Sequence, residues 1–141
     1  MEVFLKHVEL LICMEKKVEE WKKILPKEVF HVLWEKGTEP AFKGKYVDEE
    51  RVGVYVCAGC NHELFDSYSK FHSGSGWPSF TKPIHPDAVS KKPDFSFGMK
   101  RTEVLCASCG GHLGHVFDDG PKPEGKRYCI NSLALKFKDK K

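Results

Sequence analysis

The sequence predicts a mainly β, largely antiparallel domain with helices at its N-terminal end. Apolar residues recur at helical spacing before Gly37, whereas short β-rich runs separated by turn residues follow from Thr38. Two Cys-x-x-Cys pairs stand at the ends of two of these runs. At 141 residues the chain has the length of a single domain.

The helical part divides into two short helices. Apolar residues recur at helical spacing within Met14–Leu25. Pro26 suits the first turn of a second helix, which ends at Gly37. We therefore divide the chain into a helical N-terminal extension, residues 1–25, and one domain, residues 26–141.

The β part contains four clear strand patterns and one long connection. Thr81–Asp94 contains three prolines, which predict a connecting loop. The predicted strands are Val52–Cys57, Arg101–Cys106, Leu113–Phe117 and Arg127–Phe137.

The two cysteine pairs predict one structural zinc ion. A two-residue spacer lets both sulfurs of a pair face the same ion, and two such turns complete a tetrahedron of thiolates. Such a site is closed, so it stabilises the fold and takes no part in catalysis. Iron, an iron–sulfur centre or redox-active thiols are the alternatives. The four ligands are Cys57, Cys60, Cys106 and Cys109.

Composition and patterning favour a cytoplasmic protein without membrane or nucleic-acid partners. No apolar run approaches the length of a membrane span, and no export signal is recognisable. The formal charge is +3 and is not concentrated in a basic patch, apart from the short Lys-rich end of the chain. In a reducing cytoplasm cysteines serve as metal ligands or nucleophiles more often than as structural disulfides.

One cysteine outside the two pairs lies in a polar strand pattern. If Arg127–Phe137 is a single strand, then Arg127, Cys129 and Asn131 share one face. A nearby cation lowers the pKa of a thiol and so increases its reactivity. The alternative is that Cys129 is a small buried apolar residue.

Two further clusters are candidates for the same site. Trp77 lies in a turn rich in glycine and stiffened by proline, where an indole suits the wall of a small pocket. His112 and His115 precede Asp119 and a turn, and either histidine is a candidate general acid or a structural hydrogen-bonding group.

At these residues the chain resembles the B-type methionine sulfoxide reductases, from about Val29 through Phe137. The resemblance implies a β-tent-like fold of two antiparallel sheets and reduction of the R epimer of methionine sulfoxide, free or in proteins. It implies a thioredoxin-like reductant, and we expect a monomer. By the same resemblance Cys129 is the nucleophile and Trp77 packs against the substrate methyl. The remaining roles are to position water and protonate the sulfoxide oxygen (His112, His115, Asn131) and to support the site electrostatically (Arg127, Asp119).

The regeneration of Cys129 departs from the pattern of many relatives, which carry a second cysteine within the domain. Residues 61–105 contain no cysteine, so the candidates are Cys13 and an external thiol, of which we favour the external thiol. Two other functions stay open at this point. A zinc-ribbon module that binds nucleic acid or protein would use the cysteine pairs alone, and a zinc-thiolate redox sensor would release its metal on oxidation.

Overall fold

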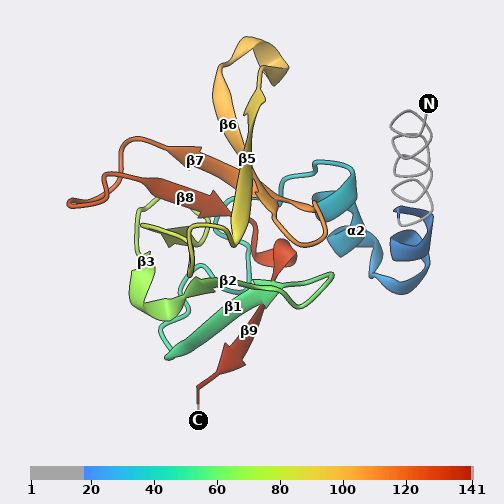
Figure 1. The fold of residues 1–141 in the computed structure, drawn as a ribbon, viewed down its shortest axis with the longest axis horizontal. Helices are drawn as coiled ribbons and strands as arrows, with labels where there is room; N and C mark the ends of the chain where they lie inside the picture. The colour runs from blue at the N-terminus through green and yellow to red at the C-terminus, as the bar shows by residue number, and fades with distance from the viewer. Residues whose placement is uncertain (1–17, 141) are drawn as a thin grey trace, which may run out of the picture.

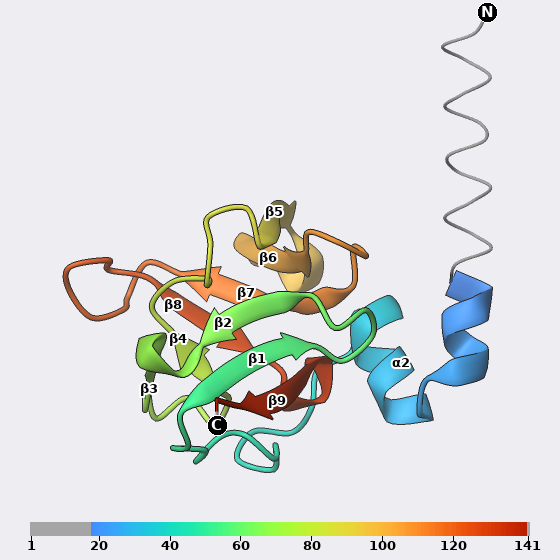
Figure 2. The ribbon, with the colours of Figure 1, turned by 60° about the horizontal axis from the view of Figure 1, so that its bottom comes forward.

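The computed structural model describes residues 18–140, which form two antiparallel sheets with helices at one end (Figure 1). A short helix over residues 18–24 is followed by α2 (Lys27–Trp34). Figure 2 shows the three-stranded sheet lying across the six-stranded sheet. The predicted architecture of a mainly β fold with two antiparallel sheets is therefore confirmed.

The strands of each sheet come from distant parts of the sequence. The three-stranded sheet has the order β2 (Glu63–Asp66), β1 (Gly53–Cys57), β9 (Leu135–Asp139). The six-stranded sheet has the order β3 (Lys70–Phe71), β4 (Ser79–Phe80), β8 (Arg127–Ile130), β7 (His112–Phe117), β6 (Arg101–Cys106), β5 (Val89–Asp94). Short 3₁₀ turns occur at η1 (Ser67–Ser69), η2 (Ser96–Gly98) and η3 (Ser132–Ala134).

Aromatic rings from both sheets form the centre of the core. Phe65 of β2 stacks on Phe80 of β4 with ring centroids 4.4 Å apart, and Tyr55 of β1 meets Phe80 edge-on at 5.1 Å. All three side chains are fully buried. Burial of apolar area on this scale is the main force that holds the sheets together.

The helices cover the end of the molecule where the cysteine pairs lie. Leu33 of α2 is buried beside Gly59 and Gly111, one in each cysteine turn. Trp21 stacks on Trp34 with centroids 6.0 Å apart, so these two indoles pack the helices against each other. Among residues 18–140, no helix has the length and apolar character that a membrane crossing requires.

The prediction of one strand over Arg127–Phe137 is wrong. β8 ends at Ile130, and the chain passes through Asn131 and η3 before β9 begins in the other sheet. Asn131 is held at this crossing because its backbone and side-chain amides both donate to the Leu113 carbonyl at 3.0 Å. Its side-chain oxygen accepts a hydrogen bond from the Glu39 amide at 3.0 Å.

The prediction of a loop over Thr81–Asp94 is wrong for its last six residues. Val89–Asp94 forms β5, which pairs with β6 from Val89 opposite Cys106 to Asp94 opposite Arg101. β5 is the edge strand of its sheet, a position where proline is tolerated. The short strands β2, β3 and β4 were also not predicted from the sequence.

Candidate active site and metal centre

The two cysteine turns converge on one point between the sheets. Cys57 ends β1 of the three-stranded sheet and Cys60 follows it, whereas Cys106 ends β6 of the six-stranded sheet and Cys109 follows it. Cys57 Sγ lies 3.7 Å from Cys109 Sγ, and Cys60 Sγ lies 3.6 Å from Cys106 Sγ. All four sulfurs lie within 4.8 Å of one another.

These separations fit a metal with four thiolate ligands. A regular tetrahedron of sulfurs about 2.3 Å from a central ion has edges of roughly 3.8 Å. The turns are closed by backbone hydrogen bonds from Asn61 to the Cys57 carbonyl and from Gly110 to the Cys106 carbonyl. Asn61 and Gly110 both have positive φ, which lets each chain curl back around its pair of sulfurs. The cluster can therefore hold a metal ion that links the two sheets.

Cys129 opens into a separate pocket of about 290 Å³. Five of the seven predicted catalytic residues line it: Trp77, His115, Arg127, Cys129 and Asn131. Thr38, Ser75, Arg101, Gly114 and Phe117 complete the wall. A larger cavity of about 600 Å³ between the helices and the three-stranded sheet contains none of the seven.

Strand pairing places Cys129 between two polar neighbours. His115 of β7 is directly opposite Cys129 of β8, and Ser79 of β4 is opposite it on the other side. Tyr128 and Ile130 are buried, whereas Arg127 and Cys129 are partly exposed on the other face of the strand. The prediction that Arg127 and Cys129 share a face is confirmed, and Asn131 reaches the same pocket from beyond the strand's end.

The Cys129 thiol is subject to opposing electrostatic effects. Burial raises its pKa above the ordinary value, whereas a contact with the Ser75 hydroxyl and the charge of Arg127 lower it. Ser75 Oγ lies 3.8 Å from Cys129 Sγ. Burial outweighs the other two effects, so Cys129 rests as a thiol at neutral pH. Arg127 acts in the direction expected from the sequence but does not dominate.

The loop that carries Trp77 is fixed by hydroxyl groups and by one distant carbonyl. Trp77 Nε1 donates to the Glu39 carbonyl at 3.0 Å. Ser73 Oγ contacts Ser75 Oγ at 2.8 Å and Ser79 Oγ at 2.7 Å. The indole is therefore held in one orientation at the pocket wall, as a preorganised binding surface requires.

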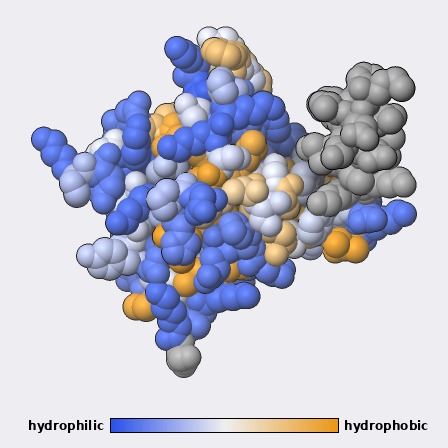
Figure 3. Space-filling model, viewed as in Figure 1, coloured by the Kyte–Doolittle hydropathy of each residue, from blue (hydrophilic) through white to orange (hydrophobic). Residues whose placement is uncertain are grey.

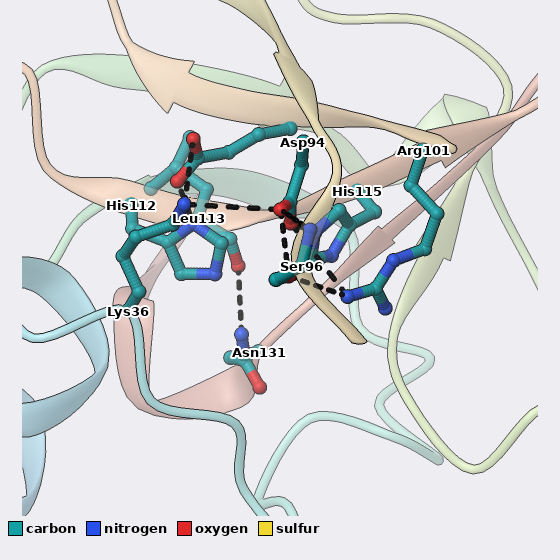
Figure 4. Close-up of polar contacts among 9 residues, drawn as sticks. Lys36, Asp94, Ser96, Arg101, His112, Leu113, His115 and Asn131 are labelled. Atoms are coloured by element: carbon teal, nitrogen blue, oxygen red, sulfur yellow. Dashed lines mark hydrogen bonds and ion pairs between the residues drawn. The ribbon is translucent and has the colours of Figure 1, made fainter. Parts of the chain in front are cut away.

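His112 and His115 are each paired with a carboxylate that was not predicted from the sequence (Figure 4). His115 Nε2 lies 2.7 Å from Asp94 Oδ2, and His112 Nδ1 lies 2.5 Å from Glu103 Oε2. The two imidazole centroids are 5.5 Å apart. His112 is buried beside His115 and does not line the pocket.

Charges around this group favour the ionised carboxylate of Asp94. Hydrogen bonds from Ser96 and His115 hold the pKa of Asp94 well below its usual range. Lys36 Nζ lies 3.6 Å from Glu103 Oε1 and 4.0 Å from Asp94 Oδ1. Burial lowers the pKa of His112, although Glu103 opposes that shift.

Asp119 lies outside the pocket and contacts it only through Arg127. Arg127 Nε and Nη2 donate to the two Asp119 oxygens at 2.9 and 3.2 Å. The Asp119 side chain is 64% exposed. The Arg127 guanidinium also stacks 4.4 Å above the Phe117 ring, so one carboxylate and one ring fix its position.

Sequence comparisons match nearly the whole described chain. A model of the SelR domain matches residues 25–139. A protein of Methanosarcina barkeri named peptide methionine sulfoxide reductase MsrB is 56% identical over 126 residues, which cover 89% of each chain. Proteins of the same name from Leptospira interrogans and Bradyrhizobium diazoefficiens are 55% and 56% identical over 124 and 125 residues. These alignments cover 88% and 89% of this chain, and 95% and 90% of those relatives.

Proposed function

This chain belongs to the SelR domain family of peptide methionine sulfoxide reductases, and from that membership we propose that it reduces the R epimer of methionine sulfoxide to methionine. The chain is thus an oxidoreductase, and Cys129 is its proposed nucleophile. The observation that carries this assignment is the position of Cys129 in a small pocket, directly opposite His115 and beside Trp77.

The proposed reaction balances as an oxygen transfer between two sulfur atoms. The Cys129 sulfur attacks the sulfoxide sulfur while the sulfoxide oxygen takes up a proton. The oxygen then moves to the Cys129 sulfur, while its bond to the methionine sulfur and the new sulfur–sulfur bond both break. Methionine leaves with the electron pair of that sulfur–sulfur bond on its sulfur, and Cys129 is left as a sulfenic acid. Because Cys129 rests as a thiol, its own proton must leave as the bond to the substrate forms.

The pocket residues divide into groups that bind the substrate and groups that handle the proton. Trp77 packs against the substrate methyl, because its indole is fixed at the pocket wall. His115 protonates the sulfoxide oxygen, and Asn131 orients water or that oxygen. His112 does not reach the pocket, so we assign it a positioning role beside His115.

Two further groups support the site electrostatically. Arg127 stabilises the thiolate that forms as Cys129 attacks, because its positive charge lowers the pKa of that thiol. Asp119 orients Arg127 through its two hydrogen bonds.

The metal held by the four cysteines is proposed to be one structural zinc ion. Four thiolates at tetrahedral separations suit zinc, and a closed site leaves no position for a substrate. None of the four ligands lines the Cys129 pocket. The ion would therefore hold the sheets together while the chemistry takes place at Cys129.

Regeneration requires two thiols, which we propose come from a thioredoxin-like reductant. One thiol condenses with the sulfenic acid, releases water and forms a disulfide, which a second thiol then reduces. Cys13 is the alternative first thiol and lies outside the described residues. A site that depends on free thiols favours a reducing cytoplasm, and we expect the protein to act as a monomer on free or protein-bound sulfoxide.

The match of the SelR model to residues 25–139 supports the proposed division of the chain. Residues 26–141 form the reductase domain, and residues 1–25 form an N-terminal extension. The zinc-ribbon alternative is not favoured, because it gives no role to the pocket around Cys129.

The direct test uses the separate R and S epimers of N-acetylmethionine sulfoxide with dithiothreitol as reductant. We expect methionine release from the R epimer alone and none from the Cys129→Ser variant, because a serine hydroxyl cannot replace the thiolate. Trp77→Ala should mainly raise KM, since it opens the pocket. Substantial activity in Cys129→Ser would show that another residue is the nucleophile.

A further inference from the structure

Exposed apolar side chains gather at the tip of the β5–β6 hairpin, which projects from the body of the molecule (Figure 1). We call residues 95–100 the hairpin tip. The exposed fractions of Phe95, Phe97 and Met99 are 65%, 89% and 47%. These are three of the seven exposed large apolar side chains found in residues 18–140, and Figure 3 shows hydrophobic colour at this tip. Clustering of this kind marks an interaction surface.

The backbone at Phe97 points to the same conclusion. Phe97 has φ of 57°, in the left-handed region that bulky residues rarely adopt. A strained backbone that leaves its aromatic ring 89% exposed gains no packing within the chain in return. The ring is therefore held outward, available to a binding partner.

Short polar contacts connect the hairpin tip to the Cys129 pocket. The Asp94 carboxylate accepts the Ser96 amide at 3.0 Å and the Ser96 hydroxyl at 2.6 Å, which fixes the start of the tip. The other Asp94 oxygen lies 2.7 Å from His115, directly opposite Cys129. Arg101, at the end of the tip, lines the pocket itself. The hairpin tip is thus bounded by Asp94, which contacts a pocket residue, and by Arg101, which lines the pocket.

The chemistry of oxidised methionine identifies the partner that fits this surface. Methionine is mostly buried in folded proteins, where it packs among apolar side chains. On one face of a strand or helix some of these side chains lie two to four residues away in the sequence. Oxidation makes the side chain polar and disrupts the core around it, which exposes those neighbours. A polypeptide that presents methionine sulfoxide to the pocket therefore brings apolar side chains to its rim.

We propose that the hairpin tip binds the apolar residues that flank a methionine sulfoxide in an unfolded polypeptide. This inference rests on the proposed function and adds to it a preference for apolar residues beside the sulfoxide. Phe97 and Phe95 would determine the preference for the residues that flank the sulfoxide, and neither touches the reacting atoms.

The test compares three R-sulfoxide substrates under dithiothreitol: N-acetylmethionine sulfoxide, a peptide with leucine and phenylalanine around the sulfoxide, and a peptide with serine and glycine in those places. The parent protein should have the highest kcat/KM for the apolar peptide. Phe97→Asn should lower that value about tenfold, mainly through KM, because a buried phenylalanine contact is lost. Asparagine tolerates the left-handed backbone, so this variant should fold normally.

Tyr68→Asn is the matched control, because Tyr68 is 91% exposed and does not line the pocket. It should leave all three values unchanged. Equal parent values for the two peptides, or an equal loss on all three substrates in Phe97→Asn, would overturn the inference. A parent protein inactive on every substrate, including the small one, would instead refute the proposed function on which the inference rests.

Discussion

At Cys129 burial and charge act on the same proton in opposite directions. Burial disfavours the thiolate, whereas Arg127 and Ser75 favour it, and burial has the larger effect on the pKa. The reactivity of Cys129 should therefore rise with pH beyond neutrality. Removing the positive charge of Arg127 should raise the pKa further and shift the pH profile of reactivity to higher pH.

We predict that Arg127→Met slows alkylation of Cys129 by iodoacetamide several-fold at pH 7, with the deficit shrinking as the pH rises. Modification is followed by mass spectrometry of the peptide that contains Cys129. Lys126→Met is the control, because Lys126 pairs with the exposed Asp118 beyond the pocket. A profile unchanged by Arg127→Met would show that the guanidinium does not act on the thiol.

The histidine pairs show which residues a single sequence does not reveal. His112 and His115 could be identified as candidates because they lie close to each other and to Asp119. Asp94 and Glu103 could not be identified, because they become partners of the two histidines only when β5 and β6 pair beside β7. The available signal was the carboxylate of Glu103 directly before three apolar residues of its strand, and this side chain is 2% exposed.

At the scale of elements, the two cysteine turns bring together the end of β1 in one sheet and the end of β6 in the other. Cys106→Ser should release the metal, because three thiolates no longer close the tetrahedron. Structural zinc contributes about 10–16 kcal/mol in small peptides, against about 5–15 kcal/mol for the stability of a whole domain. We therefore predict that Cys106→Ser is largely unfolded at 25 °C, as judged by circular dichroism and by metal content.

Cys129→Ser provides the comparison for this variant, since Cys129 is not a ligand. It should keep one zinc per chain and the thermal midpoint of the parent. A Cys106→Ser variant that is folded, unfolds cooperatively and contains no metal would contradict a structural role for the metal.

The β7–β8 pair depends on one glycine at the point where it carries the site. A Cβ on Gly114 would lie 2.0 Å from the Cys129 carbonyl oxygen, so the strands would have to separate. We predict that Gly114→Ala costs at least about 1–3 kcal/mol of stability and most of the activity. Urea unfolding and turnover of the R epimer measure both effects. Gly125→Asn is the control, because a Cβ at Gly125 meets nothing within 4 Å and Gly125 does not line the pocket.

Residue periodicity predicted the elements better than it predicted their limits. Arg101–Cys106 was predicted with the bounds that the structure shows. Arg127–Phe137 reads as one strand because its apolar pattern continues while the chain changes sheets at Asn131, and only the contacts with Leu113 and Glu39 mark the break. Val89–Asp94 was missed because Pro93 excludes a central strand but not an edge strand.

At the scale of the whole molecule, the regeneration of Cys129 needs a second thiol. The candidate within the chain is Cys13, which the sequence analysis places in the N-terminal extension. We predict that Cys13→Ser retains turnover with thioredoxin, thioredoxin reductase and NADPH, because an external thiol reaches the pocket directly. The rate of NADPH oxidation with the R epimer measures this. Loss of thioredoxin-driven turnover together with normal dithiothreitol-driven turnover would assign the first thiol to Cys13.

The two sheets meet at the crossing from β8 to β9, and the molecule is organised around it. On one side of Asn131 the chain presents Cys129 to the pocket, and beyond η3 it completes the sheet that carries Cys57. The four-cysteine cluster and Cys129 thus belong to one structural framework.

The proposed reaction requires Cys129 to take the oxygen from the R sulfoxide. The most direct measurement is a single turnover without reductant, in which methionine release and the modification of each cysteine are quantified together. With the R epimer we predict one methionine per chain and one added oxygen on Cys129, trapped as a dimedone adduct, and neither with the S epimer. Methionine release with Cys129 unmodified, or no release from the R epimer, would contradict the claim.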